Sequence, residues 1–258
     1  MEQLVLYNVS DRIATITINR PEKRNALNPE LIEALTIAFQ QAEEDERVKV
    51  IILNSNGSTF SAGADLEYLQ QLQNNSFEEN VADSKRLKKL FTTIYYLPKI
   101  VIAQVEGHAI AGGCGLATIC DIIFATPESS FGYTEVKIGF VPAIVSCFLM
   151  QKVNETIAKE ILLTGKTFPA EQALKFNLIN FVTKSEEINQ KVKEFALSLC
   201  VGSSGNSLMI TKQLISQTTK PLLEKTLETA IQINARVRES ADFKKGIASF
   251  LNKEKINW

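Results

Sequence analysis

The chain has 258 residues, of which 45% are hydrophobic and 22% charged, so it can bury a substantial core. Its formal net charge of -1 gives no basic excess of the kind that nucleic-acid binding requires. The N-terminus lacks the features of a signal peptide, and no apolar run reaches the ~20 residues needed to span a bilayer. We therefore expect a cytoplasmic protein with neither a nucleic-acid nor a membrane partner.

The cysteines and the single histidine argue against a metal site. Four cysteines are scattered without paired spacing, and only one histidine, His108, is present. Zinc sites normally combine several such ligands at short spacings, so we expect reduced, mostly buried thiols and no bound metal.

The first half of the chain alternates strand and helix patterns. Residues 4–9 and 13–18 alternate apolar and polar side chains, which predicts a β-hairpin turning at Ser10 and Asp11. Asn28 and Pro29 then form a helix start, and residues 48–55 form a buried strand. A polar helical stretch ends before Pro98, and two further strand-like runs follow, KIVIAQVEG and DIIFAT. This alternation is typical of α/β architecture with mainly right-handed crossovers.

The second half is almost wholly helical from about Ile144 onward. Residues 186–200, 206–217 and 220–239 carry apolar side chains at three- and four-residue intervals, as amphipathic helices do. We expect an α/β core over residues 1–195 and a C-terminal helical region over residues 196–258.

Two glycine-containing segments follow predicted strands and precede predicted helices. HAIAGGCGLATICD contains Gly112 and Gly113, and FSAGADLEYL contains Ala64. Unpaired first-turn amides at two neighbouring loops could bind one oxygen, as stabilisation of an enolate requires. A Gly-Gly pair also fits a tight contact between a helix and a sheet, where no side chain has room.

Five motifs together resemble the enoyl-CoA hydratase/isomerase, or crotonase, superfamily. They are INRPEKRNALN, FSAGADL, GHAIAGGCGLATICD, FGYTEVKIGFVP and FKKGIASFLNK. The resemblance implies a crotonase-like spiral of ββα units with a C-terminal helical trimerisation region, assembled as a homotrimer or as a hexamer of two trimers. It implies an acyl-CoA substrate, with coenzyme A as part of that substrate and no separate cofactor. It places the two oxyanion-binding amides on Ala64 and Gly112, and matches no catalytic position with His108.

The resemblance also implies where coenzyme A and the acyl group bind. The positions are Lys23, Arg24, Ala26, Ala62, Asp65, Leu66, Gly113 and Tyr133. The two cations suit phosphate groups, to which they donate charge-assisted hydrogen bonds. Phe250 and Lys253 match positions that reach a neighbouring subunit's nucleotide in some relatives, although an ordinary amphipathic terminal helix explains them equally well.

Only one of the two glutamates that hydratases of this family use is present. Glu135 stands in FGYTEVKIG, whereas Gly115 replaces the other. One carboxylate can move a proton from C2 to C4 of a 3-enoyl-CoA, while hydration normally divides its proton transfers between two. Isomerase chemistry is therefore slightly favoured. The alternatives are a hydratase or lyase that uses Glu135 with a water bound by Tyr133, and a non-catalytic acyl-CoA-binding relative. The run FVPAIVSCFLM after Gly139 replaces the glycine-rich, polar segment of many hydratases and predicts a more apolar acyl pocket.

Overall fold

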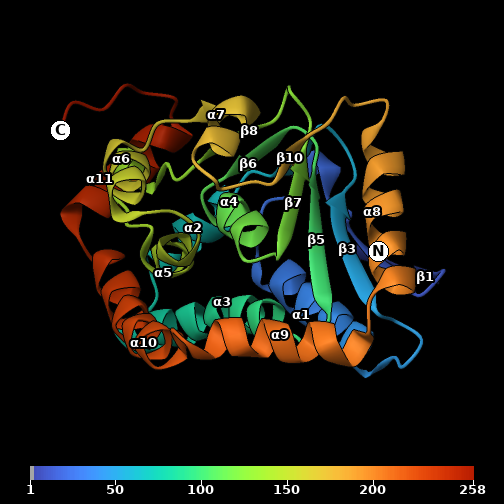
Figure 1. The fold of residues 1–258 in the computed structure, drawn as a ribbon. Helices are drawn as coiled ribbons and strands as arrows, with labels where there is room; N and C mark the ends of the chain where they lie inside the picture. Colours follow the sequence, from blue (N-terminus) through green and yellow to red (C-terminus); the bar gives the residue numbers. More distant parts are fainter. Residues whose placement is uncertain (1–2) are drawn as a thin grey trace.

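The computed structural model describes residues 3–258 and arranges them as two β-sheets surrounded by helices (Figure 1). The larger sheet has six strands in the order β1-β2-β3-β5-β7-β10, and the smaller has four in the order β4-β6-β8-β9. The larger sheet consists of β1 (Val5–Ser10), β2 (Ile13–Ile18), β3 (Val50–Ser55), β5 (Ile100–Val105), β7 (Ile122–Ala125) and β10 (Phe181–Val182). The smaller consists of β4 (Thr59–Ser61), β6 (His108–Ile110), β8 (Ser130–Gly132) and β9 (Phe168–Pro169).

The N-terminal hairpin forms as predicted, but its turn lies one residue further along. Ser10 pairs with Ile13, so Asp11 and Arg12 make the turn, with φ angles of +55° and +66°. Two consecutive positive φ angles are the requirement of a two-residue type I′ turn, whose twist matches the flanking strands.

The rest of the core repeats a strand-strand-helix unit, which confirms the expected ββα spiral. Strands β2, β3, β5 and β7 are parallel neighbours, and each of the last three is followed by one strand of the smaller sheet. The helices that then follow are α2 (Leu66–Leu72) and α3 (Phe77–Tyr96), α4 (Gly112–Thr118), and the 3-10 helix η2 (Glu135–Ile138) with α5 (Ala143–Lys152). Because β4, β6 and β8 are parallel neighbours, the segments that follow them leave the small sheet at the same edge.

Local sequence signals set the ends of the long helices. Asn28 accepts a hydrogen bond from the Leu31 amide at 3.0 Å, and Pro29 opens α1 (Pro29–Glu44). Proline at the first helical position removes no hydrogen bond, so this start is favoured by both residues. Ser76 and Glu79 form a capping box at the start of α3.

The large sheet is covered on both faces. Alternate side chains of β2, β3 and β5 pack with α1 and α3 in the main core, while the others pack against α8 (Ile188–Gly202). Figure 1 shows α8 lying along one side of the sheet. Ile188, Val192 and Ala196 form its inward face at helical spacing. The predicted division at residue 195 falls inside this helix and stays a prediction.

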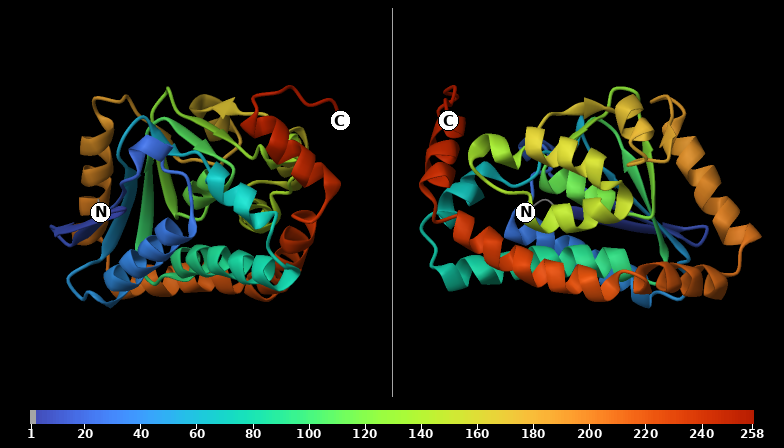
Figure 2. Two further views of the ribbon diagram at one scale, coloured as in Figure 1. Left: turned by 180° about the vertical axis from the view of Figure 1, so that it is seen from behind. Right: turned by 60° about the vertical axis from the view of Figure 1, so that its left-hand side comes forward.

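Three further helices complete the chain, and the first two lie where the sequence predicted helices over residues 206–217 and 220–239. They are α9 (Gly205–Gln217), α10 (Lys220–Val237) and α11 (Ala241–Leu251). Figures 1 and 2 show α9 and α10 running beneath α1 and α3, and α11 turning up on the side opposite α8. The short segments η1 (Pro21–Lys23), α6 (Glu155–Thr164) and α7 (Ala170–Lys175) connect these layers. No helix within residues 3–258 combines the length and apolar character needed to cross a membrane.

Candidate active site

The loops after β4 and β6 meet backbone to backbone. Gly63 has a φ angle of +88°, and a Cβ atom on it would lie 2.9 Å from both the Ala111 Cβ and the Ile110 carbonyl oxygen. The same position is 3.4 Å from the Gly112 nitrogen. Any side chain at Gly63 would therefore push the two loops apart, which explains the glycine.

Ala64 and Gly112 provide free amides at this junction. Within residues 3–258 neither nitrogen donates a hydrogen bond to protein, although their neighbours do. The Asp65 amide donates to the Leu27 carbonyl at 2.8 Å, and the Ala111 amide donates to the Gly132 carbonyl at 2.7 Å. These bonds fix both loops while leaving the two donors available, as a preformed oxyanion-binding site requires.

Ala111 stands beside this pair in a backbone conformation that favours glycine. Its φ and ψ angles are +50° and -122°, and it precedes the first residue of α4. A residue with a Cβ atom is strained by roughly 1–3 kcal/mol in such a region. The Ala111 backbone therefore stores strain immediately next to the Gly112 amide.

Glu135 is a buried carboxylate without a counter-ion. It opens η2, is 6% exposed, and its Oε2 atom has no hydrogen-bond partner within residues 3–258. Burial raises the pKa of Glu135 to about 7, and a hydrogen bond with its own backbone opposes this rise only in part. The charge of Glu135 also contributes, after burial, to a raised pKa of Cys114, which places the carboxylate close to α4.

Tyr133 belongs to the core rather than to an open pocket. Its side chain is fully buried, and its hydroxyl lies 2.7 Å from the Thr118 hydroxyl of α4. Burial raises the pKa of Tyr133 well above its usual value. The pair ties the end of β8 to α4, and the hydroxyl that would have to hold a water molecule is fully buried.

Gly115 faces two apolar side chains at the position where hydratases of this family were expected to carry a second glutamate. A Cβ atom on Gly115 would lie 3.0 Å from both the Val145 Cβ and the Phe91 Cε2, and closer still to the Val145 Cγ1. Contacts this short are not tolerated between carbon atoms. Gly113 is similarly confined, because a Cβ on it would lie 2.6 Å from the Ser61 Cβ.

Of the charged residues predicted to bind coenzyme A, two are exposed and one is buried in an ion pair. Lys23 is exposed and pairs with Glu67 at 2.6 Å, and Arg24 is exposed in the left-handed region with a φ of +50°. Asp65 is only 5% exposed, caps α2 and pairs with Arg20 at 2.6 Å. Its side chain therefore has a structural role, whatever its backbone contacts.

The small and apolar residues predicted to bind coenzyme A lie in the segment after η1 and the segment that leads into α2, which the hydrogen bond from the Ala62 amide to the Arg24 carbonyl joins. Ala26 is buried, Ala62 is partly buried and Leu66 is exposed. Sequence reasoning missed Arg20, although this residue stands within the INRPEKRNALN motif and donates a hydrogen bond to Asp65, the neighbour of Ala64.

The C-terminal helix of the same chain packs over this region. Phe243 and Ile247 of α11 form a small cluster with Leu69 and Leu72 of α2, and Ala64 packs against it. Figure 2 shows α2 and α11 on one side of the molecule. Phe250, at the end of α11, is 50% exposed, and Lys253 is also exposed.

Within residues 3–258 the His108 side chain makes no hydrogen bond with Glu135 or with the amides of Ala64 and Gly112. It opens β6, is exposed, and its Nδ1 is 2.6 Å from the Ser130 hydroxyl. Residues 3–258 contain no group of three or more His, Cys, Asp or Glu side chains suited to a metal ion.

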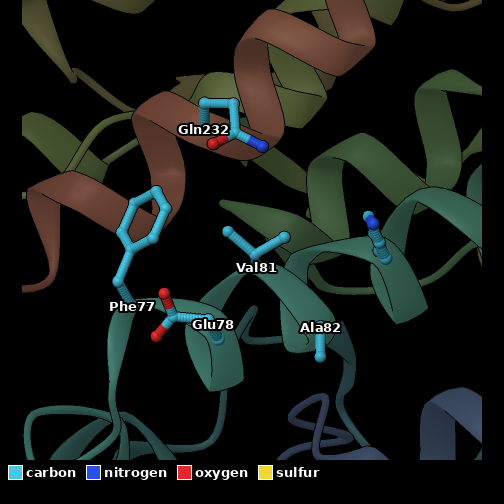
Figure 3. Close-up of a pocket in the computed structure, with 6 residues that line it drawn as sticks. Phe77, Glu78, Val81, Ala82 and Gln232 are labelled. Carbon is cyan, nitrogen blue, oxygen red and sulfur yellow. The ribbon is translucent and has the colours of Figure 1, made fainter.

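A surface hollow of about 340 Å³ lies between α3 and α10 and is distinct from the site. Figure 3 shows it, with Phe77 and Val81 of α3 pointing toward Gln232 of α10. A second hollow of about 330 Å³ lies between β1 and α1. Neither is lined by Glu135 or by the residues of the two loops.

Known proteins are similar to this chain in both sequence and fold. Residues 8–258 match the model of a family described as enoyl-CoA hydratase/isomerase. A Thermus thermophilus protein named "Putative enoyl-CoA hydratase" is 39% identical over 241 residues, which are 93% of this chain and 95% of the relative. A Streptococcus mutans trans-2-decenoyl-(acyl-carrier-protein) isomerase is 25% identical over 253 residues, which are 97% of this chain and 96% of the relative.

A solved structure completes the comparison. The crystal structure of an enoyl-CoA hydratase from Mycobacterium avium superimposes with a TM-score of 0.89 at 30% identity and covers 100% of both chains. The family match over nearly the whole chain, the ββα spiral and the loops around Ala64 and Gly112 agree with one another. The chain therefore belongs to the enoyl-CoA hydratase/isomerase family of the crotonase superfamily and is an enzyme of that family.

Proposed function

We propose that the protein shifts the double bond of an unsaturated acyl-CoA thioester, converting a 3-enoyl-CoA into a 2-enoyl-CoA. The observation that carries this proposal is the solitary buried carboxylate of Glu135, whose pKa is raised to about 7. A group with a pKa near neutrality can accept a proton and return it at similar cost, as a reaction with two opposite proton transfers needs.

The reaction divides into two proton transfers. Glu135 removes a proton from C2, and the electron pair moves onto the thioester oxygen as an enolate. The amides of Ala64 and Gly112 donate hydrogen bonds to that oxygen. Glu135 then returns the proton at C4 while the C3–C4 double bond becomes C2–C3. Removing one such donor typically costs ~3 kcal/mol of transition-state stabilisation.

Hydration of a 2-enoyl-CoA is the second candidate function. It adds a hydroxyl to C3 and a proton to C2, and normally uses two carboxylates. The Streptococcus mutans relative is named an isomerase, whereas the Mycobacterium avium structure is named a hydratase, so the family includes both names. The full burial of Tyr133 disfavours the Tyr133-bound water that hydration by this chain would need.

Coenzyme A is proposed to bind along two segments, the one that follows η1 and the one that leads into α2. Lys23 and Arg24 are exposed cations suited to its phosphates, and binding would require Lys23 to exchange Glu67 for phosphate. Ala26, Ala62 and Leu66 would contact the adenine and pantetheine. Phe250 and Lys253 are proposed to reach the nucleotide in a neighbouring subunit of a homotrimer or a hexamer.

A substrate panel tests the activity. The protein is incubated with matched 2-enoyl-, 3-enoyl- and 3-hydroxyacyl-CoAs, and each product is identified by mass and chromatography. We expect isomerisation of the 3-enoyl-CoA to be faster than hydration of its 2-enoyl isomer, and Glu135→Gln to lower isomerisation by at least ~10²-fold. Binding without turnover of any substrate would instead indicate a non-catalytic acyl-CoA-binding protein.

A further inference from the structure

Val145 and Phe91 occupy the space that a side chain at position 115 would need. Val145 lies in the first turn of α5, and Phe91 lies on α3, so two elements distant in sequence close over one face of α4. Val145 is 4% exposed and Phe91 is fully buried. The glycine at position 115 is therefore matched by the size of its neighbours.

This arrangement is held rigidly. The Phe91 ring packs against Phe148 with centroids 5.7 Å apart, and Phe148 also contacts Tyr95 with centroids 5.3 Å apart. Val145 is β-branched, and such side chains have one strongly preferred rotamer in a helix. Val145 therefore cannot swing aside to admit a side chain at position 115, whereas the Phe91 ring, with its Cε2 3.0 Å from such a Cβ, would have to shift by only a few tenths of an ångström.

We propose that Val145, supported by Phe91, is a specificity-determining residue that excludes the second acid and its water and so restricts the enzyme to proton transfer by Glu135. This inference rests on the proposed isomerase function and extends it to the packing of α4, α5 and α3. Hydration requires a water molecule whose oxygen bonds to C3, whose proton leaves to a base, and a proton donor for C2. An apolar wall beside α4 provides neither the base nor a polar partner for that water.

The first test measures packing without reference to catalysis. Gly115→Ala is expected to lower Tm in the wild-type background, although alanine is the better helix former. The same substitution made together with Val145→Gly is expected to cost clearly less, because the Val145 atoms are gone. Gly202→Ala is the matched control: a Cβ there meets nothing within 4 Å, so Tm should not fall.

The second test measures the reaction. Gly115→Glu alone is expected to destabilise the protein without gain of hydration. Gly115→Glu combined with Val145→Gly is expected to raise the ratio of hydration to isomerisation at least ~10-fold, a fraction of the usual effect of a general acid or base. Gly115→Gln with Val145→Gly is the control, because it has the same size but cannot exchange a proton.

The two tests separate the possible failures. Equal Tm losses from Gly115→Ala in both backgrounds would overturn the packing claim, even if the larger variants fail to fold. A folded double variant whose activity ratio is unchanged, or is matched by the glutamine control, would overturn the specificity claim. A wild-type enzyme that hydrates faster than it isomerises would instead overturn the proposed function, and the substrate panel detects that separately.

Discussion

Glu135, the proposed acid/base, has a burial that is costly for folding and suited to proton transfer. A carboxylate that ionises in a buried, cation-free environment loses its hydration without gaining an ion pair. The same loss brings its pKa to about 7, where it exchanges protons readily. We infer that the free energy spent on burying Glu135 gives the residue its reactivity.

Replacing Glu135 with glutamine should therefore stabilise the protein while removing its activity. The pKa rises from 4.5 to about 7 on folding, and each tenfold change in acid strength corresponds to about 1.4 kcal/mol. The ionised residue thus costs on the order of 3 kcal/mol. Chemical denaturation at pH 8 should show Glu135→Gln to be more stable than the wild type.

The sign of this effect with pH provides the control. Between pH 4.5 and about 7 the folded protein holds a proton that the unfolded chain has released, so the Glu135 contribution to unfolding free energy falls as pH rises. The advantage of Glu135→Gln should accordingly shrink toward pH 4.5. An advantage that stays constant with pH would show that ionisation is not its cause.

The same carboxylate predicts the pH dependence of the reaction. In the proposed reaction, removal of a proton from C2 requires ionised Glu135, so kcat/KM for a 3-enoyl-CoA should fall about tenfold for each pH unit below about 7. Initial rates across pH 5 to 9, with stability checked at each pH, measure this. An inflection near the ordinary glutamate value would contradict the burial of Glu135 in the free enzyme.

Ala111 yields a prediction from backbone strain. Glycine adopts its φ of +50° and ψ of -122° without the Cβ penalty, so Ala111→Gly should raise stability by about 1 kcal/mol after the entropic cost of glycine. Thermal unfolding should show a Tm rise of about 2–4 °C. Asn177→Gly is the comparison, because asparagine tolerates its φ of +58° and should gain less. A lower Tm for Ala111→Gly would mean that the Cβ packing beside Gly63 outweighs the strain.

A buried ionic cluster joins three helices next to the site. Asp83 of α3 pairs with Arg238, the residue after α10, at 2.7 Å, and accepts a hydrogen bond from Tyr68 of α2. Arg238 also donates to the Asn80 side chain at 3.2 Å. Because α2 begins just after Ala64, this cluster links the position of a proposed oxyanion donor to the C-terminal helices.

Asp83→Asn should therefore be strongly destabilising. It leaves the Arg238 charge buried without its counter-ion, which typically costs about 3–5 kcal/mol. The control is the surface pair of Asp45 and Arg47, in which the Arg47 side chain is 78% exposed, so Arg47→Met should cost less than about 1 kcal/mol. Denaturant titrations of both variants measure the difference. Similar small losses in both would show that the buried pair contributes no more than a surface pair.

Sequence patterns predicted the long elements but not the short ones. The alternation of apolar and polar side chains in β1 and β2 and the Asn28 cap of α1 are local signals, so the sequence alone predicted them. The strands of the smaller sheet have two or three residues and are too short for any periodicity, so only the ββα resemblance anticipated them. Their pairing depends on contacts between segments far apart in the chain.

The candidate site shows the same limit. The motifs pointed to Ala64, Gly112 and Glu135, but the full burial of Tyr133 and its bond to Thr118 depend on how β8 meets α4. The matching of Gly115 with Val145 joins two different helices, and no spacing in the sequence predicts such a contact. A motif can thus propose the residues of a site, but it does not predict the neighbours that set their chemistry.

Helix α9 buries a charged side chain and exposes apolar ones. Lys212 is the buried residue of α9, where it pairs with Asp121 at 2.7 Å, while Leu214 and Ile215 are 60% and 67% exposed. Leu222 of α10 is also 67% exposed. A helix that turns a lysine inward and leucine and isoleucine outward is suited to a subunit interface, in agreement with the proposed trimer.

Leu214→Glu should consequently dissociate the proposed assembly. A charge placed in the apolar centre of an interface loses its hydration on association, so it favours separate subunits. Size-exclusion chromatography with light scattering should show a trimer or hexamer for the wild type and a smaller species for the variant. Leu163→Glu on α6 introduces the same charge at a leucine that is 74% exposed, and should leave the mass unchanged.

If Phe250 and Lys253 reach a neighbour's nucleotide, Leu214→Glu should also raise KM for acyl-CoA at low protein concentration, whereas Leu163→Glu should not. An unchanged mass for Leu214→Glu would exclude this face of α9 from the interface and would leave the exposed leucine and isoleucine without that explanation.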